Sequence, residues 1–475
     1  MNKSHFMEKR AKMVCTIGPA SQSEEIMTQL IMAGMDVARL NFSHGTHDEH
    51  LKSIEMIRRV SDKLNKPIAI LQDLQGPKIR IGKFSDGPVT IQQGDEFTIS
   101  TKDRPGDSKG VSTTYKNLSN DVSAGDTILI NDGLIKLNVK EKNETDVICI
   151  VVNGGVLYDH KGINLPGVKI SEPSLTKKDE KDLKFGLEHG IDYVALSFVR
   201  NAEILREIKR KMGNNVIPVV AKLEKPEALE NLDEIIEEAD VIMVARGDLG
   251  VEILPEKVPV VQKQIIEKCR SAGVPVITAT QMLDSMMVNP VPTRAEASDV
   301  ANAIFDGSDA VMLSGETAFG KYPVESVQMM HRIICEAEKG KYFRLNSDIL
   351  QREKPDSFSE SICHSAAVSA RDINARYIVV FTESGYTAKI MSKFRPCVPV
   401  LALTRHSKTL RRLALYWGTV PLHMDKKVEV KQGLENLENR LSQDNLISSD
   451  DTLVIIAGSM MEEGGTNMMR LHRVK

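Results

Sequence analysis

Features that indicate particular classes of protein are scarce in this sequence of 475 residues. Aromatic residues make up only 4% of it, and 62 Lys and Arg residues against 65 Asp and Glu residues leave a formal net charge of -3. Few rings for base stacking and no excess of positive charge give no basis for binding nucleic acid or an anionic membrane. No stretch approaches the ~20 apolar residues of a membrane span, and residues 1–13 lack the apolar run of a signal peptide. We therefore expect a cytoplasmic protein that binds neither nucleic acid nor membrane.

The cysteines are also few and form no recognisable ligand motif. The sequence has no Cys-x-x-Cys pair and no His at the spacing of zinc ligands. We expect reduced thiols that mostly serve as small core residues, as is usual for cytoplasmic proteins. The six are Cys15, Cys149, Cys269, Cys335, Cys363 and Cys397.

Short apolar runs rich in β-branched residues recur along the chain, each followed by a turn and a segment with helical periodicity. Strands covered on both faces lose the alternation of polar and apolar residues, so the repeat predicts an α/β protein with a closed (β/α)8 TIM barrel. An open doubly wound sheet gives a similar pattern, but the number of units and the placement of polar residues favour the barrel. The eight runs are 13–17, 35–40, 67–71, 191–198, 216–223, 240–245, 274–279 and 309–313.

The spacing of these runs is much longer between the third and the fourth, where a segment of different character is inserted. Residues 82–166 alternate polar and apolar residues between Gly-Asp and Asp-Gly turns, which predicts a small β-barrel domain. On a loop at the catalytic face of the barrel, this domain is placed to act as a lid. The barrel domain is then discontinuous, 1–81 and 167–340. A linker-like stretch leads into residues 341–475, where alternating helices and apolar runs predict an α/β domain with a mainly parallel sheet.

Polar residues end or follow the eight apolar runs. In a barrel the carboxyl ends of the strands meet at one face, where polar residues are typically catalytic. Cations opposite carboxylates also form structural salt bridges at a barrel rim, and the pattern alone leaves that alternative open. The residues are Arg39, Asn41, Ser43, His44, Asp73, Arg80, Lys222, Glu224, Arg246, Gly247, Asp248, Thr280, Ser314 and Glu316.

Glu224 and Asp248 follow consecutive runs and are the candidate ligands of a hard cation. Two carboxylates are too few for a calcium site. They suit Mg2+ (or Mn2+), which keeps water ligands and takes the rest from phosphate or substrate. A surface ion pair of Glu224 with Lys222 or Lys225 is the alternative. Against it, Lys222 and Glu224 are two residues apart on a strand and project to the same side.

Other residues at this face suit phosphate chemistry. Arg39 and Lys222 are candidates for neutralising phosphoryl oxygens as charge spreads in a transition state. If a helix begins at Gly247 and Asp248, its free N–H groups would hold a carboxylate or a phosphate. Thr280 is a candidate for orienting a proton-carrying water, with a purely structural hydroxyl as the alternative.

Seven segments together resemble the pyruvate kinase family. The resemblance runs in order along essentially the whole chain and includes the inserted β domain and the C-terminal domain. It implies transfer of the phosphoryl group of phosphoenolpyruvate to ADP, giving pyruvate and ATP in glycolysis, by a homotetramer. It also disfavours a rim of purely structural salt bridges. The segments are VARLNFSHG, LQDLQGPKIR, AKLEKPEAL, VARGDLGVE, ITATQMLDSM, PTRAEASDVANAI and DAVMLSGETAFGKYP.

The resemblance implies roles in substrate binding that agree with the chemistry above. Arg39 would bind the phosphate of phosphoenolpyruvate, and Lys222 would stabilise the phosphoryl group in transit. Gly247, Asp248 and Thr280 would hold the substrate carboxylate. Thr280 would also belong to the relay that protonates the enolate, and trapping pyruvate as the ketone makes the transfer strongly downhill.

The resemblance implies metal and nucleotide contacts as well. Glu224 and Asp248 would hold the divalent metal. Arg80 and, from the lid, Lys161 would contact the nucleotide phosphates, with His44 and Asn41 nearby.

One departure from the family pattern concerns the monovalent cation. Members that need potassium carry a glutamate after the proline of the segment DTKGPEIRT, where this chain has Lys78. A fixed ammonium group would take the place of the cation, because two positive charges would repel. We therefore predict that potassium is not required, although the family's ligand pattern is retained at Asn41, Ser43, Asp73 and Leu74.

The C-terminal domain holds a second candidate site. In the segment FTESGYTAK a strand-to-helix turn forms a suitable nest for a phosphate, with ordinary helix capping as the alternative. Pyruvate kinases bind sugar phosphates on a similar loop. Glu383 stands where members activated by fructose bisphosphate often carry lysine, so the resemblance favours AMP or a sugar monophosphate as the effector. The residues of this turn are Thr382, Ser384, Gly385 and Thr387.

Two other functions fit parts of the pattern. A magnesium-dependent lyase or aldolase acting on pyruvate enolate would use the same carboxylates, but it would not need a lid lysine for nucleotide phosphates. A non-catalytic metabolite-binding homologue predicts a damaged site. All five residues that such damage would remove are present, namely Arg39, Lys222, Glu224, Asp248 and Thr280.

Overall fold

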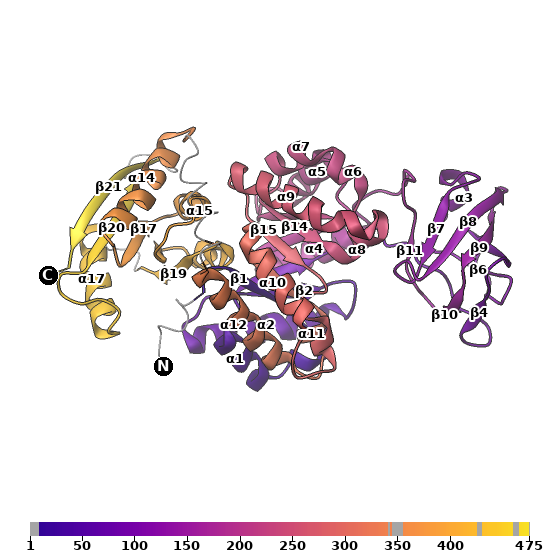
Figure 1. Cartoon of the computed structure of the whole chain (residues 1–475), viewed down its shortest axis with the longest axis horizontal. Helices are drawn as coiled ribbons and strands as arrows, with labels where there is room; N and C mark the ends of the chain where they lie inside the picture. The colour runs from indigo at the N-terminus through magenta and orange to yellow at the C-terminus, as the bar shows by residue number, and fades with distance from the viewer. Residues whose placement is uncertain (1–8, 341–342, 344–354, 425–429, 459–464, 475) are drawn as a thin grey trace.

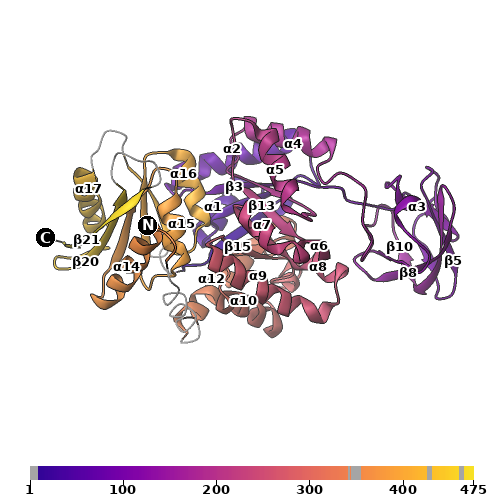
Figure 2. The ribbon, with the colours of Figure 1, turned by 90° about the horizontal axis from the view of Figure 1, so that it is seen from above.

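The structure is a computed structural model, and it describes residues 9–340, 343, 355–424, 430–458 and 465–474. In this part of the chain the barrel lies between the lid and the C-terminal domain (Figures 1 and 2). Residues 1–8 of the N-terminus and most of the predicted linker after residue 340 lie outside the described residues. Among the helices that are described, none is long and apolar enough to cross a membrane.

The eight predicted runs form the strands of the central domain: β1 (Lys12–Ile17), β2 (Val37–Asn41), β3 (Ala69–Asp73), β12 (Tyr193–Leu196), β13 (Val219–Leu223), β14 (Val241–Ala245), β15 (Val276–Ala279) and β16 (Ala310–Leu313). They close into a parallel barrel in the order β1-β16-β15-β14-β13-β12-β3-β2, which confirms the predicted fold. All strands except β2 are buried throughout, because side chains fill the interior and helices cover the outside.

Helices surround the barrel, and several start at caps encoded in the sequence. Thr46, Thr176 and Thr293 each accept the backbone N–H three residues on, while the acidic side chain there bonds back to the cap. These capping boxes fix where the helices begin, and hence the loops at the catalytic face. The helices are α1 (Glu24–Ala33), α2 (His47–Leu64), α4 (Lys177–Glu188), α5 (Ala202–Met212), α6 (Pro226–Glu230), α7 (Leu232–Glu238), α8 (Arg246–Glu252), α9 (Val258–Ala272), α10 (Arg294–Asp306), α11 (Gly315–Ala318) and α12 (Pro323–Lys339), with 3-10 turns at Pro19–Ser21, Pro255–Lys257 and Asp284–Met287.

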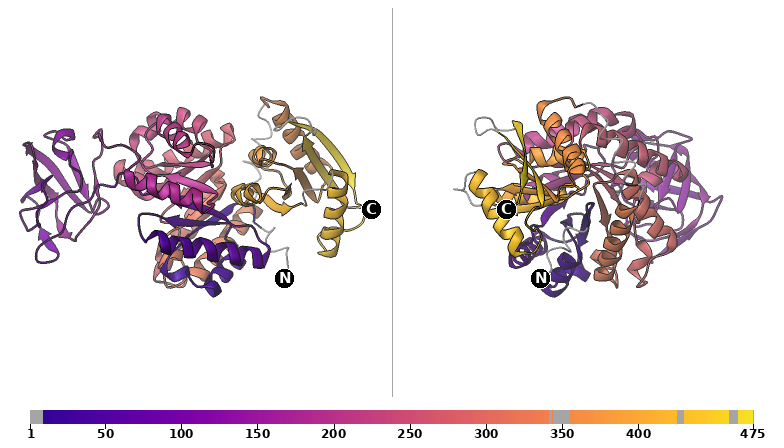
Figure 3. Two further views of the ribbon diagram at one scale, coloured as in Figure 1. Left: turned by 180° about the vertical axis from the view of Figure 1, so that it is seen from behind. Right: turned by 60° about the vertical axis from the view of Figure 1, so that its left-hand side comes forward.

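The inserted β domain is confirmed and has an apolar core of its own. Its elements are β4 (Val89–Ile91), β5 (Glu96–Ser100), β6 (Gly110–Ser112), α3 (Leu118–Asp121), β7 (Thr127–Ile130), β8 (Ile135–Lys142), β9 (Asp146–Asn153), β10 (Gly155–Leu157) and β11 (Ile163–Asn164). They form a curled six-stranded sheet, β11-β7-β8-β9-β5-β6, and the two-stranded sheet β10-β4 (Figure 3). Strand β11 is the part of the lid sheet beside the barrel (Figure 1).

The C-terminal domain is an α/β domain with a mainly parallel sheet, as predicted. Its elements are α14 (Phe358–Asp372), β17 (Tyr377–Phe381), α15 (Tyr386–Lys393), β18 (Val400–Thr404), α16 (Ser407–Arg412), a 3-10 turn (Leu413–Leu415), β19 (Thr419–His423), α17 (Val430–Gln443), β20 (Thr452–Gly458) and β21 (Thr466–Arg473). The sheet order is β19-β18-β17-β20-β21, and only β21 is antiparallel. The sequence predicts no strand at β21, because its mostly exposed side chains form no apolar run.

The C-terminal domain packs against the end of the barrel opposite the lid (Figure 1). Lys12 and Tyr193 are the first residues of their strands, and both reach this domain: Lys12 Nζ donates to the Thr419 carbonyl (2.6 Å), and the Tyr193 hydroxyl donates to the Arg412 carbonyl (2.7 Å). The carboxyl ends of the strands, with their polar residues, therefore face the lid.

Candidate active site

The carboxylate of Asp73, at the end of β3, lies inside a cluster of charges. Oδ2 lies 2.7 Å from both Nε and Nη2 of Arg39 on the neighbouring strand β2. Oδ1 lies 3.3 Å from Nζ of Lys222, an ion pair rather than an aligned hydrogen bond. Burial alone would raise the pKa of Asp73, but Lys222 and Arg39 outweigh it and hold that pKa below its usual range. Asp73 is therefore an anion that fixes two cations.

Lys222, on β13, has its ammonium group within reach of several oxygens. Nζ donates to Ser197 Oγ (2.7 Å) and lies 2.9 Å from Glu224 Oε1. Burial lowers the pKa of an amine, yet the carboxylates of Asp73 and Glu224 outweigh burial and raise the pKa of Lys222. Lys222 therefore carries a permanent positive charge beside the strand ends, as its predicted role with a phosphoryl group requires.

Glu224 and Asp248, the candidate metal ligands, repel each other electrostatically. The pKa of Glu224 is raised, first by burial and also by repulsion from Asp248, against the pull of Lys222. A divalent cation between the two carboxylates would relieve both effects. The pair with Lys222 is buried, so Glu224 does not form the surface ion pair of the alternative interpretation. Among the described residues no group of three or more His, Cys, Asp or Glu side chains could hold a metal ion.

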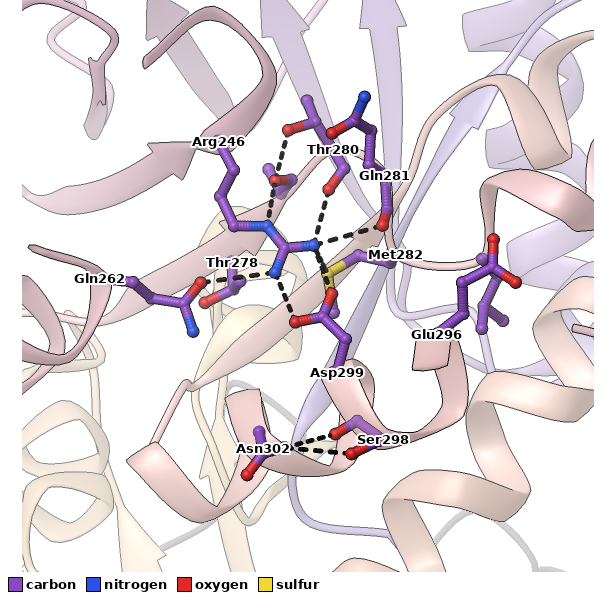
Figure 4. Close-up of polar contacts among 12 residues, drawn as sticks. Arg246, Gln262, Thr278, Thr280, Gln281, Met282, Glu296, Ser298, Asp299 and Asn302 are labelled. Atoms are coloured by element: carbon purple, nitrogen blue, oxygen red, sulfur yellow. Dashed lines mark hydrogen bonds and ion pairs between the residues drawn. The ribbon is translucent and has the colours of Figure 1, made fainter. Parts of the chain in front are cut away.

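Helix α8 begins at Arg246, so the predicted helix start at the Gly247–Asp248 turn is present. The Gly247 N–H donates to Thr280 Oγ1 (2.7 Å), and the Thr280 hydroxyl donates to the Ala279 carbonyl (2.6 Å; Figure 4). Thr280 has a φ of 68°, and a β-branched residue in this left-handed region costs about 1–3 kcal/mol. The Thr280 hydroxyl therefore has a structural role, since it bonds both the Gly247 N–H and the Ala279 carbonyl. These bonds also place the hydroxyl at the helix start where a substrate carboxylate is expected.

The predicted nucleotide-binding cations lie where the lid joins the barrel. Arg80 Nη1 donates to the His160 carbonyl (3.1 Å), and Lys161 Nζ lies 5.8 Å from the centre of the Tyr158 ring. The pKa of His44 is lowered, first by burial and then by cations that include Arg80 and Lys78. The charges of Arg80 and Lys78, from the segment after β3, therefore act on His44 in the loop after β2.

The space between lid and barrel includes two clefts that meet at Lys78, Asp132 and Asp248. The first is also lined by Gly162 and Asn164 of the lid and by Phe198, Arg200 and Lys225 of the barrel. The second, of about 650 Å3, is also lined by Arg246, Gly247, Gln281 and Asp299. Both clefts reach the candidate metal ligand Asp248, but the first, of about 30 Å3, has room for little more than water, so a substrate would contact the site from the second.

Glu252 and Asn164, which the sequence alone does not single out, join the lid to the barrel. Glu252 Oε1, on α8, accepts hydrogen bonds from Lys225 Nζ (2.6 Å) and from Asn164 Nδ2 on β11 (2.8 Å). The Glu252 side chain is only 1% exposed, so this ion pair with Lys225 is buried. The one signal in the sequence is that Glu252 follows Asp248 by four residues, which places both on one face of a helix.

The residues with the family's potassium-ligand pattern are brought to neighbouring strand ends. Asn41 is paired with Asp73 between β2 and β3, and its Oδ1 accepts the Ser43 N–H (3.1 Å). The Leu74 carbonyl accepts the Ser197 hydroxyl (2.8 Å). The cations that contact Asp73 are Arg39 and Lys222, while Lys78 lies along the clefts between lid and barrel.

The candidate effector residues share the turn between β17 and α15. The Thr382 hydroxyl accepts the Gly385 N–H (3.0 Å), and the Thr387 and Thr466 hydroxyls lie 2.6 Å apart. The Ser384 hydroxyl accepts the N–H of Tyr386, two residues on, at 3.4 Å. The N-cap residue of α15 is Gly385, which makes no side-chain capping bond, so the Thr382 and Ser384 hydroxyls bond N–H groups of the turn without capping the helix. Glu383 within this turn lies 2.8 Å from His406 Nε2 and 3.7 Å from Arg405, whose guanidinium group offsets part of the charge of Glu383.

Comparison with known proteins gives one family over nearly the whole chain. Residues 8–327 match the family model for the pyruvate kinase barrel domain, and residues 360–472 match that for the pyruvate kinase alpha/beta domain. Curated proteins named pyruvate kinase from Staphylococcus saprophyticus, Sporosarcina psychrophila and Staphylococcus aureus are 46%, 45% and 46% identical to the chain. Each match covers 98% of this chain and 80% of the relative.

Proposed function

The chain belongs to the pyruvate kinase family, and we propose that it transfers the phosphoryl group of phosphoenolpyruvate to ADP on the polar face of its barrel. The observation that carries this placement is the buried cluster of Arg39, Asp73, Lys222 and Glu224 at the ends of β2, β3 and β13, where the charge of Asp248 also raises the pKa of Glu224. Fixed cations stabilise a phosphoryl group in transit only if they do not have to reorganise. The contacts of Asp73 supply that rigidity.

Each end of phosphoenolpyruvate has candidate partners in this arrangement. Arg39 binds the phosphate, and Lys222 stabilises the transferred group between donor and acceptor oxygens. A divalent cation held by Glu224 and Asp248 neutralises phosphate charge when it is bound. The N–H groups at the start of α8 hold the carboxylate, for which the Gly247 N–H exchanges its bond to Thr280 Oγ1.

The enolate that remains after transfer needs a proton at its methylene carbon. Thr280 is the candidate for the relay, because its hydroxyl lies at the start of α8, 2.6 Å from one carbonyl and 2.7 Å from the Gly247 N–H. A hydroxyl that exchanges one of these partners for water can pass a proton to the bound enolate. Arg80, Lys161, His44 and Asn41 are left for the nucleotide phosphates.

The first test is pyruvate formation from phosphoenolpyruvate, ADP and Mg2+. Pyruvate release that does not depend on ADP would favour a lyase or aldolase. No turnover even with effectors present would favour a non-catalytic binding protein. For the metal ligands, Glu224→Gln should raise the Mg2+ concentration needed for half-maximal activity while the protein stays folded. An unchanged Mg2+ requirement would show that Glu224 is not a ligand of the metal.

We propose further that the enzyme does not require potassium, because Lys78 supplies a fixed positive charge near the loop after β2. Support comes from His44 in that loop, because Lys78 is one of the cations that lower the pKa of His44. Activity in a sodium-only buffer should match that in potassium, and Lys78→Glu should create a potassium requirement. Several-fold activation of the wild type by potassium would contradict the proposal.

The effector proposal is AMP or a sugar monophosphate at Thr382, Ser384, Gly385 and Thr387. Glu383 supports a single phosphate, because a second one would meet its carboxylate. AMP, ribose 5-phosphate and glucose 6-phosphate should be compared with fructose 1,6-bisphosphate as activators, in the wild type and in Ser384→Asp. Activation by fructose 1,6-bisphosphate alone would contradict the preference for a monophosphate. Activation that is unchanged in Ser384→Asp would show that the effector binds outside this turn.

The remaining proposals concern organisation. We propose the domain division 1–81 with 167–340, 82–166 and 341–475, and a homotetramer. Exposed apolar side chains on the barrel at Val288, Val291 and Phe319 support self-association, which sedimentation velocity would test. A cytoplasmic location is supported by the glycolytic reaction and by buried free thiols such as Cys15 and Cys269.

A further inference from the structure

Two consecutive residues after β15 hold an unusual backbone conformation beside the proposed active site. Thr280 and Gln281 have φ angles of 68° and 54°. The left-handed region is disfavoured for residues other than glycine, above all for a β-branched one. Such a conformation persists only where surrounding contacts hold it, and it occurs often at functional sites.

The side chain of Arg246, the first residue of α8, supplies these contacts (Figure 4). Its Nη2 donates to the carbonyls of Thr280 (2.8 Å) and Gln281 (3.4 Å), and its Nε donates to the Ala279 carbonyl (3.3 Å). One guanidinium group thus binds three successive carbonyls around the left-handed pair. Because Gly247 follows Arg246, the position of Arg246 also brings the Gly247 N–H at the start of α8 to Thr280 Oγ1.

Asp299, on α10, fixes this guanidinium group from the other side. Its Oδ1 and Oδ2 lie 2.8 Å from Nη1 and 2.7 Å from Nη2 of Arg246, a bidentate arrangement. Two parallel contacts define the plane of a guanidinium group, which a lysine ammonium group would not have. The Arg246 side chain is only 11% exposed. With its N–H groups occupied by carbonyls and by Asp299, it has little capacity left to bind a substrate in the adjoining cleft.

We propose that Arg246 and Asp299 are positioning residues for Thr280. Asp299 orients Arg246, Arg246 holds the carbonyls on both sides of Thr280, and the Thr280 hydroxyl is thereby kept at the start of α8. The inference rests on the proposed function of Thr280 in protonating the enolate. Small displacements of such a group reduce turnover by about 10- to 100-fold, and they leave the binding of phosphate by Arg39 unaffected.

The test compares Asp299→Asn and Arg246→Lys with Thr280→Val and with the double variant Asp299→Asn/Thr280→Val. Two rates are measured: kcat for pyruvate formation, and exchange of the C3 protons of pyruvate with D2O in the presence of Mg2+ and ATP. The exchange removes a proton from C3 along the route by which the enolate gains one, so it reports on the relay. Asn302→Ala is the matched control, because Asn302 lies on α10 and bonds only its neighbour Ser298 among the contacts drawn in Figure 4.

We expect Asp299→Asn and Arg246→Lys to lower both rates about 10-fold or more, with KM for phosphoenolpyruvate little changed. In the Thr280→Val background Asp299→Asn should add almost nothing, since its effect acts through Thr280. A loss of equal size in both backgrounds, or normal rates in both single variants, would overturn the inference. Normal rates in Thr280→Val would instead overturn the proposed function of Thr280, and the inference with it. Should Asp299→Asn fail to fold, Arg246→Lys in the same two backgrounds gives the same comparison.

Discussion

Lys222 stays charged inside the barrel because the carboxylates of Asp73 and Glu224 lie within 3.3 Å and 2.9 Å of its ammonium group. A buried cluster of this kind is costly to form, since each ion loses its water. Removal of one partner is costlier still, because it leaves the other charges uncompensated. The same contacts that keep Lys222 charged therefore make this cluster sensitive to any change in its charge.

Lys222→Met should accordingly have two effects. The loss of a charge that stabilises the transition state should lower kcat by about 100- to 1,000-fold, with a smaller change in KM. The variant should also unfold at a lower temperature, because Asp73 and Glu224 remain buried without their cation, and added Mg2+ should recover part of the loss. Steady-state kinetics and thermal melts with and without Mg2+ measure both effects. Near-normal turnover would show that Lys222 does not stabilise the transition state.

His44 provides a test by pH. Its pKa is lowered, by burial and by cations that include Arg80 and Lys78, so the ring gains a charge only below the usual value of ~6.5. At pH ~7.5 we expect His44→Gln to leave KM for ADP unchanged. As the pH falls well below 6.5, wild-type His44 becomes protonated and attracts the nucleotide phosphates, so its KM for ADP should fall relative to that of the variant. A parallel pH dependence of KM in the two proteins would exclude the charge of His44 from nucleotide binding.

The residues that the sequence identifies for this site are those whose own type and position at a strand end indicate their chemistry. Charged residues at strand ends, such as Lys222 and Glu224, follow from the barrel pattern alone. Asp299 does not, because it lies on a helix and acts only through Arg246, a partner that the fold brings to it. Contacts between distant segments depend on tertiary packing, and one sequence carries no signal for them.

At the scale of elements, α8 is the part on which the site depends. It presents Gly247 and Asp248 at its start and Glu252 at its end, and Glu252 binds both Lys225 of the barrel and Asn164 of the lid. Lys225 directly follows Glu224, so one contact connects both candidate metal ligands with the lid strand β11. A single buried carboxylate therefore contacts both the lid and the residue next to the candidate metal ligand Glu224.

Glu252→Gln should weaken these contacts. The amide keeps the shape but leaves Lys225 buried without an anion, which in comparable cases costs about 3–5 kcal/mol of stability. We expect a higher Mg2+ requirement and a higher KM for ADP, whereas Asn164→Ala, which removes only the lid contact, should raise KM for ADP alone. Titrations of Mg2+ and ADP for both variants separate the two effects. An equal shift in the Mg2+ requirement for the two variants would contradict the separate roles of Lys225 and Asn164.

The eight barrel strands could be predicted because burial on both faces imposes an uninterrupted apolar run on each of them. Strand β21 could not, since it lies at a sheet edge and its side chains are mostly exposed. The lid is intermediate in this respect. Its alternating pattern and its turns indicate a β domain, but the order of its strands depends on pairings between segments far apart in the sequence.

At the scale of the whole molecule, the C-terminal domain is tied to the barrel by buried ion pairs. Asp192 of the barrel binds Arg58 of its own domain and Arg411 of the C-terminal domain, each at 2.8 Å. Arg395 of the C-terminal domain binds Asp309 at the start of β16 (2.7 Å), and both side chains are less than 10% exposed. These contacts lie at the amino ends of the strands, so the two domains should unfold together rather than independently.

Arg395→Met tests this connection, because it leaves the Asp309 carboxylate buried without its cation. We expect a loss of about 3–5 kcal/mol in the free energy of unfolding, and a single calorimetric transition that separates into two as the C-terminal domain loses its anchor.

Asp309 also accepts the Val276 N–H through Oδ2, so Asp309→Asn can keep that bond while removing the charge. The double variant Arg395→Met/Asp309→Asn should therefore recover most of the lost stability, because neither charge then remains unpaired. The exposed pair Lys140–Glu96 of the lid is the control, and Lys140→Met should have little effect. A double variant as unstable as Arg395→Met would show that packing of the guanidinium group against Trp417, 4.8 Å from the ring centre, holds the domains together rather than the charge of Arg395.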